Sequence, residues 1–176
     1  MLLSIERHGI ESLPVARRYH LGVANEHRFE ADSVERTVAV VGDRWTFLIL
    51  REAFFGVRRY GELARNLGLS RTILTERLRR LVKYGVLARR RYRRNPDRYE
   101  YVLTAAGREL YPAVVVLLRW GDAHLAGPEG PPLILRHRLC GHDAAPQLTC
   151  THCGVELRAE DVEPEPGPGA DAARAA

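Results

Sequence analysis

The sequence predicts a mainly α-helical fold that carries one small β-hairpin. Apolar residues recur at helical spacing over most of residues 32–126, and a short arginine-rich stretch at residues 86–103 has the pattern of two strands around a turn. The chain has 176 residues and 45% hydrophobic content, so these elements can bury one core with room for a small appendage. We therefore expect one main domain.

Basic charge is concentrated in one part of the chain. The whole sequence contains 27 Lys and Arg against 22 Asp and Glu, a formal net charge of +5. Residues 58–98 alone hold 14 basic and 3 acidic residues, net +11, which leaves 13 basic and 19 acidic residues, net −6, for the remainder. Such an asymmetry is expected of a protein that meets a polyanion with one face.

The sequence predicts a cytoplasmic protein with no membrane association. It has no run of about eighteen apolar residues and no signal-peptide layout at its start. Three cysteines, an odd number clustered near the end of the chain, do not form a disulfide framework and would be reduced in the cytoplasm.

Two helices are predicted at the start of the domain. Residues 1–31 show no sustained helical period, and we interpret them as an N-terminal arm. Asp32 forms a capping-box pattern with Glu35, which predicts a short helix with one apolar face: Val34, Val38 and Val41. Asp43 then caps a second helix whose apolar positions lie mostly in the core: Trp45, Leu48, Ile49 and Ala53.

A helix-turn-helix layout follows. A first short helix at about 60–66 ends near Gly68, and Ser70 caps a second helix that reaches Tyr84. The second helix has a buried stripe of Leu74, Leu78 and Leu81. Its opposite side is polar and basic: Thr72, Thr75, Arg79 and Lys83.

The arginine-rich stretch is predicted to form a wing beside this motif. Residues 86–92 read as one strand, "RNPD" as a turn, and residues 98–103 as the returning strand with Tyr99, Tyr101 and Leu103 on one face. Two strands after a helix-turn-helix make a winged helix-turn-helix. Arginine guanidinium groups suit phosphate oxygens or a narrow minor groove, whereas the alternative is a merely solvated hairpin.

A last helix is predicted after Thr104, with a fresh turn or kink at Pro112. Its apolar residues exceed what one face of a small domain can hide, so part of this helix is expected to meet a second copy of the chain. A simple core role stays open for each of them: Val114, Leu117, Leu118 and Leu125.

Between Asp32 and Leu125 the chain resembles the HxlR-type winged-helix transcriptional regulators of bacteria, in the MarR-like superfamily. The resemblance rests on "GDRWTFLILREAFFGVRRYGELARNLGLSRTILTERLRRLVKYGVLARRRY" and "YEYVLTAAGRELYPAVVVLLRW". It implies that residues 32–126 are a DNA-binding and dimerisation domain, in which the first and last helices build a homodimer and two recognition helices enter successive major grooves. Many members carry a sensing cysteine where this chain has Asp32. The signal, such as a small-molecule effector, is therefore expected to act elsewhere.

We expect a sequence-specific regulator of transcription that binds double-stranded DNA, with a dimeric repressor favoured and activation left open. The alternative is a winged-helix protein-interaction module without sequence-specific DNA binding, against which the local charge argues. An enzyme is not expected, because the sequence has no nucleophile elbow, phosphate loop or open zinc site. The candidate DNA contacts are Arg58, Arg59, Arg71, Thr72, Thr75, Arg79, Arg91, Arg93, Arg94 and Arg98.

A near repeat near the end of the chain predicts a metal site. A Gly/Pro linker at 127–132 is followed, within residues 133–158, by "HRLCG" and "CTHCG", each with two soft ligands three residues apart and then glycine. This zinc-ribbon-like segment predicts one structural Zn²⁺ in a closed site of three cysteines and one histidine: His137, Cys140, Cys150 and Cys153. His142 and His152 are competing ligands, and a loop without metal is the alternative. Residues 159–176 are predicted to be a disordered tail.

Overall fold

The computed structural model describes residues 33–165, which fall into two units, one ending at Pro146 and the other beginning at Gln147. The predicted N-terminal arm, the capping residue Asp32 and the last eleven residues of the predicted tail lie outside this range. Over residues 33–165, no helix is both long and apolar enough to cross a membrane.

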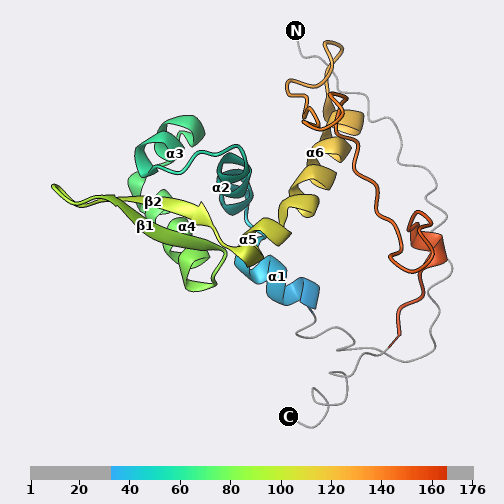
Figure 1. The fold of residues 1–176 in the computed structure, drawn as a ribbon, viewed down its shortest axis with the longest axis horizontal. Helices are drawn as coiled ribbons and strands as arrows, with labels where there is room; N and C mark the ends of the chain where they lie inside the picture. The colour runs from blue at the N-terminus through green and yellow to red at the C-terminus, as the bar shows by residue number, and fades with distance from the viewer. Residues whose placement is uncertain (1–32, 166–176) are drawn as a thin grey trace, which may run out of the picture. The chain divides into compact units, whose positions relative to one another are not determined.

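Four helices precede the hairpin: α1 (Ser33–Val41), α2 (Arg44–Phe54), α3 (Tyr60–Leu67) and α4 (Arg71–Lys83) (Figure 1). The side chain of Asp43 caps α2, and Ser70 Oγ caps α4 by accepting from the Ile73 amide at 3.4 Å. Gly68 ends α3 with a φ of 62°, a left-handed conformation that glycine adopts at little cost. The predicted helix-turn-helix is confirmed in α3 and α4.

The wing is an antiparallel hairpin of β1 (Leu87–Arg93) and β2 (Arg98–Leu103). Leu87 pairs with Leu103 at its base, and the register is irregular between Arg91 and Arg93. The amide of Tyr101 also donates to the carbonyl of Arg58 at 2.8 Å, so the segment before α3 is bound to the edge of β2. The hairpin is thereby tied to the helix-turn-helix at its base.

The core lies between α2, α3, α4 and the base of the hairpin. Its fully buried side chains come from each of these elements: Ile49, Leu50, Leu63, Leu74, Leu78, Leu81 and Leu87. The predicted stripe on α4 is confirmed, whereas α2 differs from the prediction because Leu50 and Thr46 are buried while Trp45 and Leu48 are half-buried. Helix α2 has neighbours on several sides, so its buried face is wider than a single apolar stripe.

Two helices follow the hairpin, α5 (Ala105–Glu109) and α6 (Tyr111–Leu125). Thr104 caps α5 by accepting from the Gly107 amide at 3.0 Å, and Pro112 lies in the first turn of α6, which confirms the predicted break. Among the described residues beyond Val115, none is buried, and the only further helical element is the 3₁₀ turn η2 (Ala159–Asp161). That turn occupies the first three residues of the predicted tail.

Candidate nucleic-acid interface

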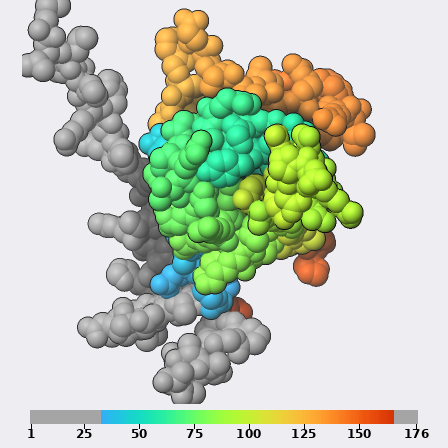
Figure 2. Space-filling model, turned by 90° about the vertical axis from the view of Figure 1, so that its left-hand side faces the viewer, coloured from blue at the N-terminus to red at the C-terminus, as the bar shows by residue number. Residues whose placement is uncertain are grey.

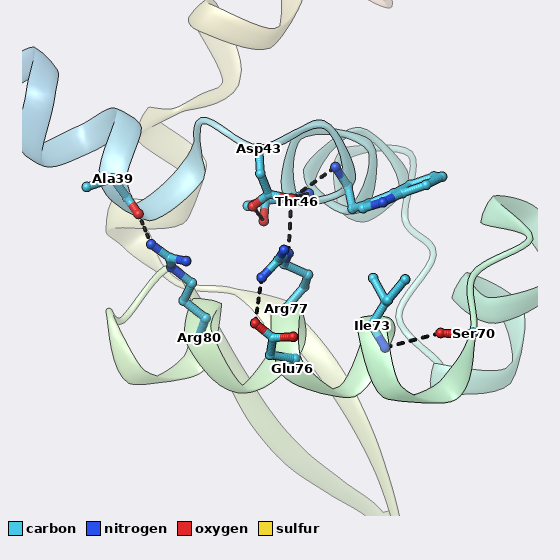
Figure 3. A network of polar contacts seen from close by, with 9 residues as sticks. Ala39, Asp43, Thr46, Ser70, Ile73, Glu76, Arg77 and Arg80 are labelled. Atoms are coloured by element: carbon cyan, nitrogen blue, oxygen red, sulfur yellow. Dashed lines mark hydrogen bonds and ion pairs between the residues drawn. The ribbon is translucent and has the colours of Figure 1, made fainter.

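Polar contacts to α1 and to the start of α2 set the position of α4 (Figure 3). Nε of Arg77 lies 3.0 Å from Oδ1 of Asp43, and the guanidinium of Arg80 donates to the carbonyl oxygen of Ala39. The Asp43 carboxylate also accepts from the amides of Trp45 and Thr46, both at 3.1 Å. These contacts fix the side of α4 that faces α1 and α2. The opposite side of α4 stays accessible.

The carboxyl group of Asp43 is stabilised in its charged form. Partial burial acts to raise its pKa, but the hydrogen bonds from the Thr46 side chain and amide, the nearby Arg77 charge and the Trp45 amide outweigh burial and lower the pKa. Its negative charge is therefore retained in the folded protein to more acidic pH than in an unfolded chain.

The free side of α4 forms a shallow groove with a volume of about 480 Å³. Four predicted DNA contacts line it together: Arg71, Thr72, Thr75 and Arg79. The fifth lining residue, Glu76, was not predicted, although its spacing from Thr72 and Arg79 puts it on the same helical face. Glu76 forms an ion pair with Arg77 at 2.7 Å, so the groove combines basic, hydroxyl and acidic groups.

Tyr60 on α3 is a second residue that the sequence analysis missed. Its hydroxyl lies 3.2 Å from Oγ1 of Thr75 and donates to the carbonyl of Arg71 at 3.1 Å. Tyr60 therefore orients a groove residue from the neighbouring helix. Its position as the first residue of α3, facing the helix that follows, is the sequence feature that could have revealed it.

The arginines of the wing fall into two groups. Some form an ion pair or stack on a ring, and the others do neither within residues 33–165. Arg90 forms an ion pair with Glu100 at 2.6 Å, and Arg89 stacks on Tyr99 with 3.5 Å between the guanidinium carbon and the ring centroid. Arg91 was a predicted DNA contact but lies 3.4 Å from a carboxylate oxygen of Asp97. Toward the tip, three exposed arginines have no ion pair or side-chain hydrogen bond within residues 33–165: Arg93, Arg94 and Arg98.

The space-filling view shows the wing standing out beside the surface of α3 and α4 (Figure 2). The two remaining predicted contacts lie in the segment before α3, which pairs with the edge of β2. Arg59 lies 3.8 Å from Glu62 and 5.0 Å from the centroid of the Tyr92 ring. Arg58 lines a separate cavity of about 270 Å³ with Arg90 and Arg108. Both are exposed, but neither lines the groove on α4.

The predicted zinc ligands lie in two turns after α6. In the first turn, Nδ1 of His137 is 3.2 Å from Sγ of Cys140. In the second, the amides of Cys153 and His152 and the Cys153 side chain hydrogen-bond the Cys150 thiol, and these contacts lower its pKa. No group of three or more His, Cys, Asp or Glu side chains is gathered for a metal anywhere in the described range, so each turn by itself is a two-ligand unit.

Known proteins resemble this chain across the helix-turn-helix and beyond it. Residues 40–128 match the HxlR-like helix-turn-helix family. The Mycobacterium tuberculosis protein Rv3095, named an HTH-type transcriptional regulator, is 60% identical over 143 residues, which are 81% of this chain and 90% of the relative.

Solved structures of other proteins also resemble this chain. The crystal structure of PA1607 has a TM-score of 0.70 and 34% identity, with 80% of this chain and 99% of that chain covered. The redox regulator HypR in its oxidized form has a TM-score of 0.50 and 32% identity, with 53% of this chain and 98% of that chain covered.

Proposed function

The chain belongs to the HxlR-like helix-turn-helix family, and from this premise we propose that it is a sequence-specific DNA-binding regulator of transcription. The observation that carries the proposal is a chemically mixed groove on α4 beside three exposed arginines toward the tip of the wing, which have no ion pair within residues 33–165. The groove on α4 can distinguish base edges, and the arginines of the wing can bind phosphates in DNA of any sequence.

Helix α4 is proposed to enter the major groove. There Arg79 can donate two hydrogen bonds to guanine, Glu76 can accept from cytosine N4, and the threonines can contact either base. Arg93, Arg94 and Arg98 are proposed to bind the backbone or the adjacent minor groove. Because Arg91 is held by Asp97, it contributes less to this contact than the sequence alone predicts.

A homodimer through α1 and α6 is part of the proposal. On α6, Val115 is buried and Val114 packs against the core, whereas Leu117 and Trp120 are 53% and 56% exposed. On α1, Val34 is 70% exposed. Within the described part of one copy these apolar side chains are largely uncovered, and a second copy that covers them would also bring two recognition helices to half-sites about 34 Å apart.

We propose repression as the outcome of binding, because a dimer on two such half-sites would cover promoter DNA that polymerase needs. HypR is named a redox regulator. In this chain all three cysteines follow residue 139, outside the family match at 40–128, so a thiol signal within that match is not proposed. A small-molecule effector is the alternative that we retain.

Footprinting of the full chain on the DNA that flanks its own gene tests this proposal. We expect a protected site with two half-sites about 10 base pairs apart, and an affinity at least about 10³-fold above that for random DNA of equal length. Equal affinity for both DNAs would contradict the proposal and favour a protein-interaction module.

Sedimentation of the same protein tests the dimer. We expect a dimer at micromolar concentration that Trp120→Glu disrupts, while Arg119→Ala, a change at an exposed polar position of the same helix, leaves it intact. A monomer in the unaltered protein would contradict the dimeric arrangement.

A further inference from the structure

The cavity of about 270 Å³ at the base of the wing has a strongly basic lining. It is bounded by the end of α2, the segment before α3, both strands of the wing and α5. Three of its seven lining residues are arginines, and none of the seven is acidic: the arginines are Arg58, Arg90 and Arg108. The groove on α4 differs, because it includes the carboxylate of Glu76. The two hollows therefore suit different partners.

Two of these arginines bring positive charge to the cavity that no carboxylate of the described residues neutralises. The guanidinium of Arg58 has no ion pair or hydrogen bond within residues 33–165, although its backbone carbonyl accepts from the amide of Tyr101 at 2.8 Å. Nη1 of Arg108 donates to the carbonyl oxygen of Leu103 at 3.0 Å. This bond uses one of the five N–H donors of a guanidinium and leaves its charge uncompensated.

The third arginine is already paired. Nε and Nη2 of Arg90 lie 2.8 Å and 2.6 Å from the same oxygen, Oε1 of Glu100. The side chain of Glu100 is only 14% exposed, and it lies opposite Arg90 in the register of the hairpin. Three guanidinium groups and this one carboxylate leave a formal charge of +2 around the cavity.

This arrangement of charge favours an anionic ligand. Like charges that are brought together without a counter-ion repel one another, and a bound anion removes that cost. A hollow lined by one sign of charge also concentrates oppositely charged solutes. Guanidinium groups bind carboxylate and phosphate oxygens through two parallel hydrogen bonds, so the chemistry of the lining fits these two groups. A charge of +2 matches a ligand with two negative charges.

The size of the cavity limits the ligand. Its volume lies below the roughly 300–1,000 Å³ of pockets that hold drug-sized molecules, so the ligand must be small. Ala53 and Val102 also belong to the lining and can contact a short carbon skeleton. A phosphate monoester or a short dicarboxylate has both the required charge and the required size.

We propose that this cavity binds such a small dianion between the guanidinium groups of Arg58 and Arg108. Arg90 keeps Nη1 available as a further donor, because Glu100 engages only its Nε and Nη2. A bound dianion would connect the segment before α3 to α5 across the base of the wing. The proposal gives Arg58 a role other than the DNA contact predicted from the sequence, and it does not depend on the DNA-binding function.

Calorimetric titration of the full chain with inorganic phosphate and with malonate, at mildly alkaline pH and constant ionic strength, tests this site. We expect one dianion to bind per chain, at least about tenfold more tightly than acetate, because acetate carries a single charge. Arg58→Ala and Arg108→Ala should each weaken binding at least about tenfold. Binding of either probe supports the site, and the preferred probe identifies phosphate or dicarboxylate as its ligand. Absence of binding by both, or acetate binding as tightly as both, would overturn the proposal.

A charge-matched control keeps the titration specific. Arg65→Ala removes an exposed arginine of α3 that does not line the cavity, and it should retain the affinity for the dianion. Arg58→Ala breaks no side-chain contact within residues 33–165, so its melting temperature without ligand should equal that of the unaltered protein. Equal weakening by Arg65→Ala and Arg58→Ala would show a diffuse attraction to the basic surface and would overturn the site.

A phosphate of the DNA backbone has the same chemistry as the proposed ligand, and the salt dependence of DNA binding separates the two sources. If the cavity holds a small dianion, Arg108→Ala should leave the slope of log K against log salt unchanged for random DNA. A slope that falls by about one unit would place a backbone phosphate in the cavity and would overturn the proposal. The titration itself contains no DNA, so its outcome is decided separately from that of the footprint.

Discussion

Nε of Arg77 lies 3.0 Å from Oδ1 of Asp43, and this contact joins the middle of α4 to the N-terminus of α2. The same carboxylate caps α2 through the amides of Trp45 and Thr46. One side chain therefore both starts a core helix and orients the helix proposed to read DNA.

Replacing this carboxylate should lower stability. Asp43→Ala removes the cap and the partner of Arg77, and we expect the free energy of unfolding to fall by about 1–2 kcal/mol in urea denaturation. Asp43→Asn keeps an acceptor for the cap and should cost less. Asp122→Ala on α6, whose carboxylate has no hydrogen bond or ion pair within residues 33–165, should change stability by less than about 0.5 kcal/mol. Equal losses for Asp43→Ala and Asp122→Ala would show that the cap is energetically unimportant.

The contribution of Asp43 should depend on pH. Because its pKa is lowered in the folded state, the unfolded chain takes up a proton first as the pH falls. The stability difference between the unaltered protein and Asp43→Asn should be complete well above 3.8, the ordinary pKa of the group, and should shrink as the pH falls through the lower folded pKa. Denaturation measured from pH 7 to pH 3 checks this; a difference that grows toward acid would contradict the sign.

Sequence patterns were sufficient where a local rule decides the structure. Asp43, Ser70 and Thr104 cap helices as predicted, and Gly68 ends α3, because each depends on only a few neighbouring residues. The second strand was predicted with the observed limits, 98–103, because it lies between a turn and a capping residue.

Tertiary partners decided what the sequence could not. The ion pair of Arg91 with Asp97 depends on how the hairpin folds, and the bond from Tyr60 to Thr75 depends on the crossing of α3 and α4. Glu76 was overlooked because an argument from net charge draws attention only to basic residues. Val34 and Val38 share a helical face as predicted, yet one copy leaves both exposed.

Gly107 should tolerate no side chain. It is buried in α5, and a Cβ there would overlap the carbonyl oxygen of Val86, so Gly107→Ala is expected to destabilise the fold by about 1–3 kcal/mol. Gly121 on α6 is the matched control, because among the described residues nothing outside its own stretch of helix lies within 4 Å of a Cβ placed there. Gly121→Ala should be stabilising by up to about 1 kcal/mol in thermal denaturation. A neutral Gly107→Ala would mean that α5 can shift away from the hairpin.

Arg94 near the wing tip should contribute to affinity without contributing to sequence preference. It is exposed and has no ion pair within the described range, so Arg94→Ala should weaken binding to cognate and random DNA alike. The slope of log K against log salt should fall by about one unit for one lost phosphate contact. Arg119→Ala, which removes an exposed arginine from α6, should leave both slope and affinity unchanged. A loss confined to cognate DNA would reassign Arg94 to base contact.

Arg79 and Glu76 should determine sequence preference instead. Both line the groove on α4, so Arg79→Ala should cost about 1–3 kcal/mol on cognate DNA, mostly by relaxing the preference at one base pair, with a smaller loss on random DNA. Glu76→Ala should also relax preference at one position, but it removes a negative charge and should therefore raise the affinity for random DNA. Binding selection from a randomised library measures both effects, and Arg65→Ala on α3 serves as the control for loss of an exposed positive charge. If Arg79→Ala and Arg65→Ala lowered cognate and random binding by the same factor, the groove on α4 would be a site of backbone contact, and the base-reading surface would have to be sought elsewhere on the domain.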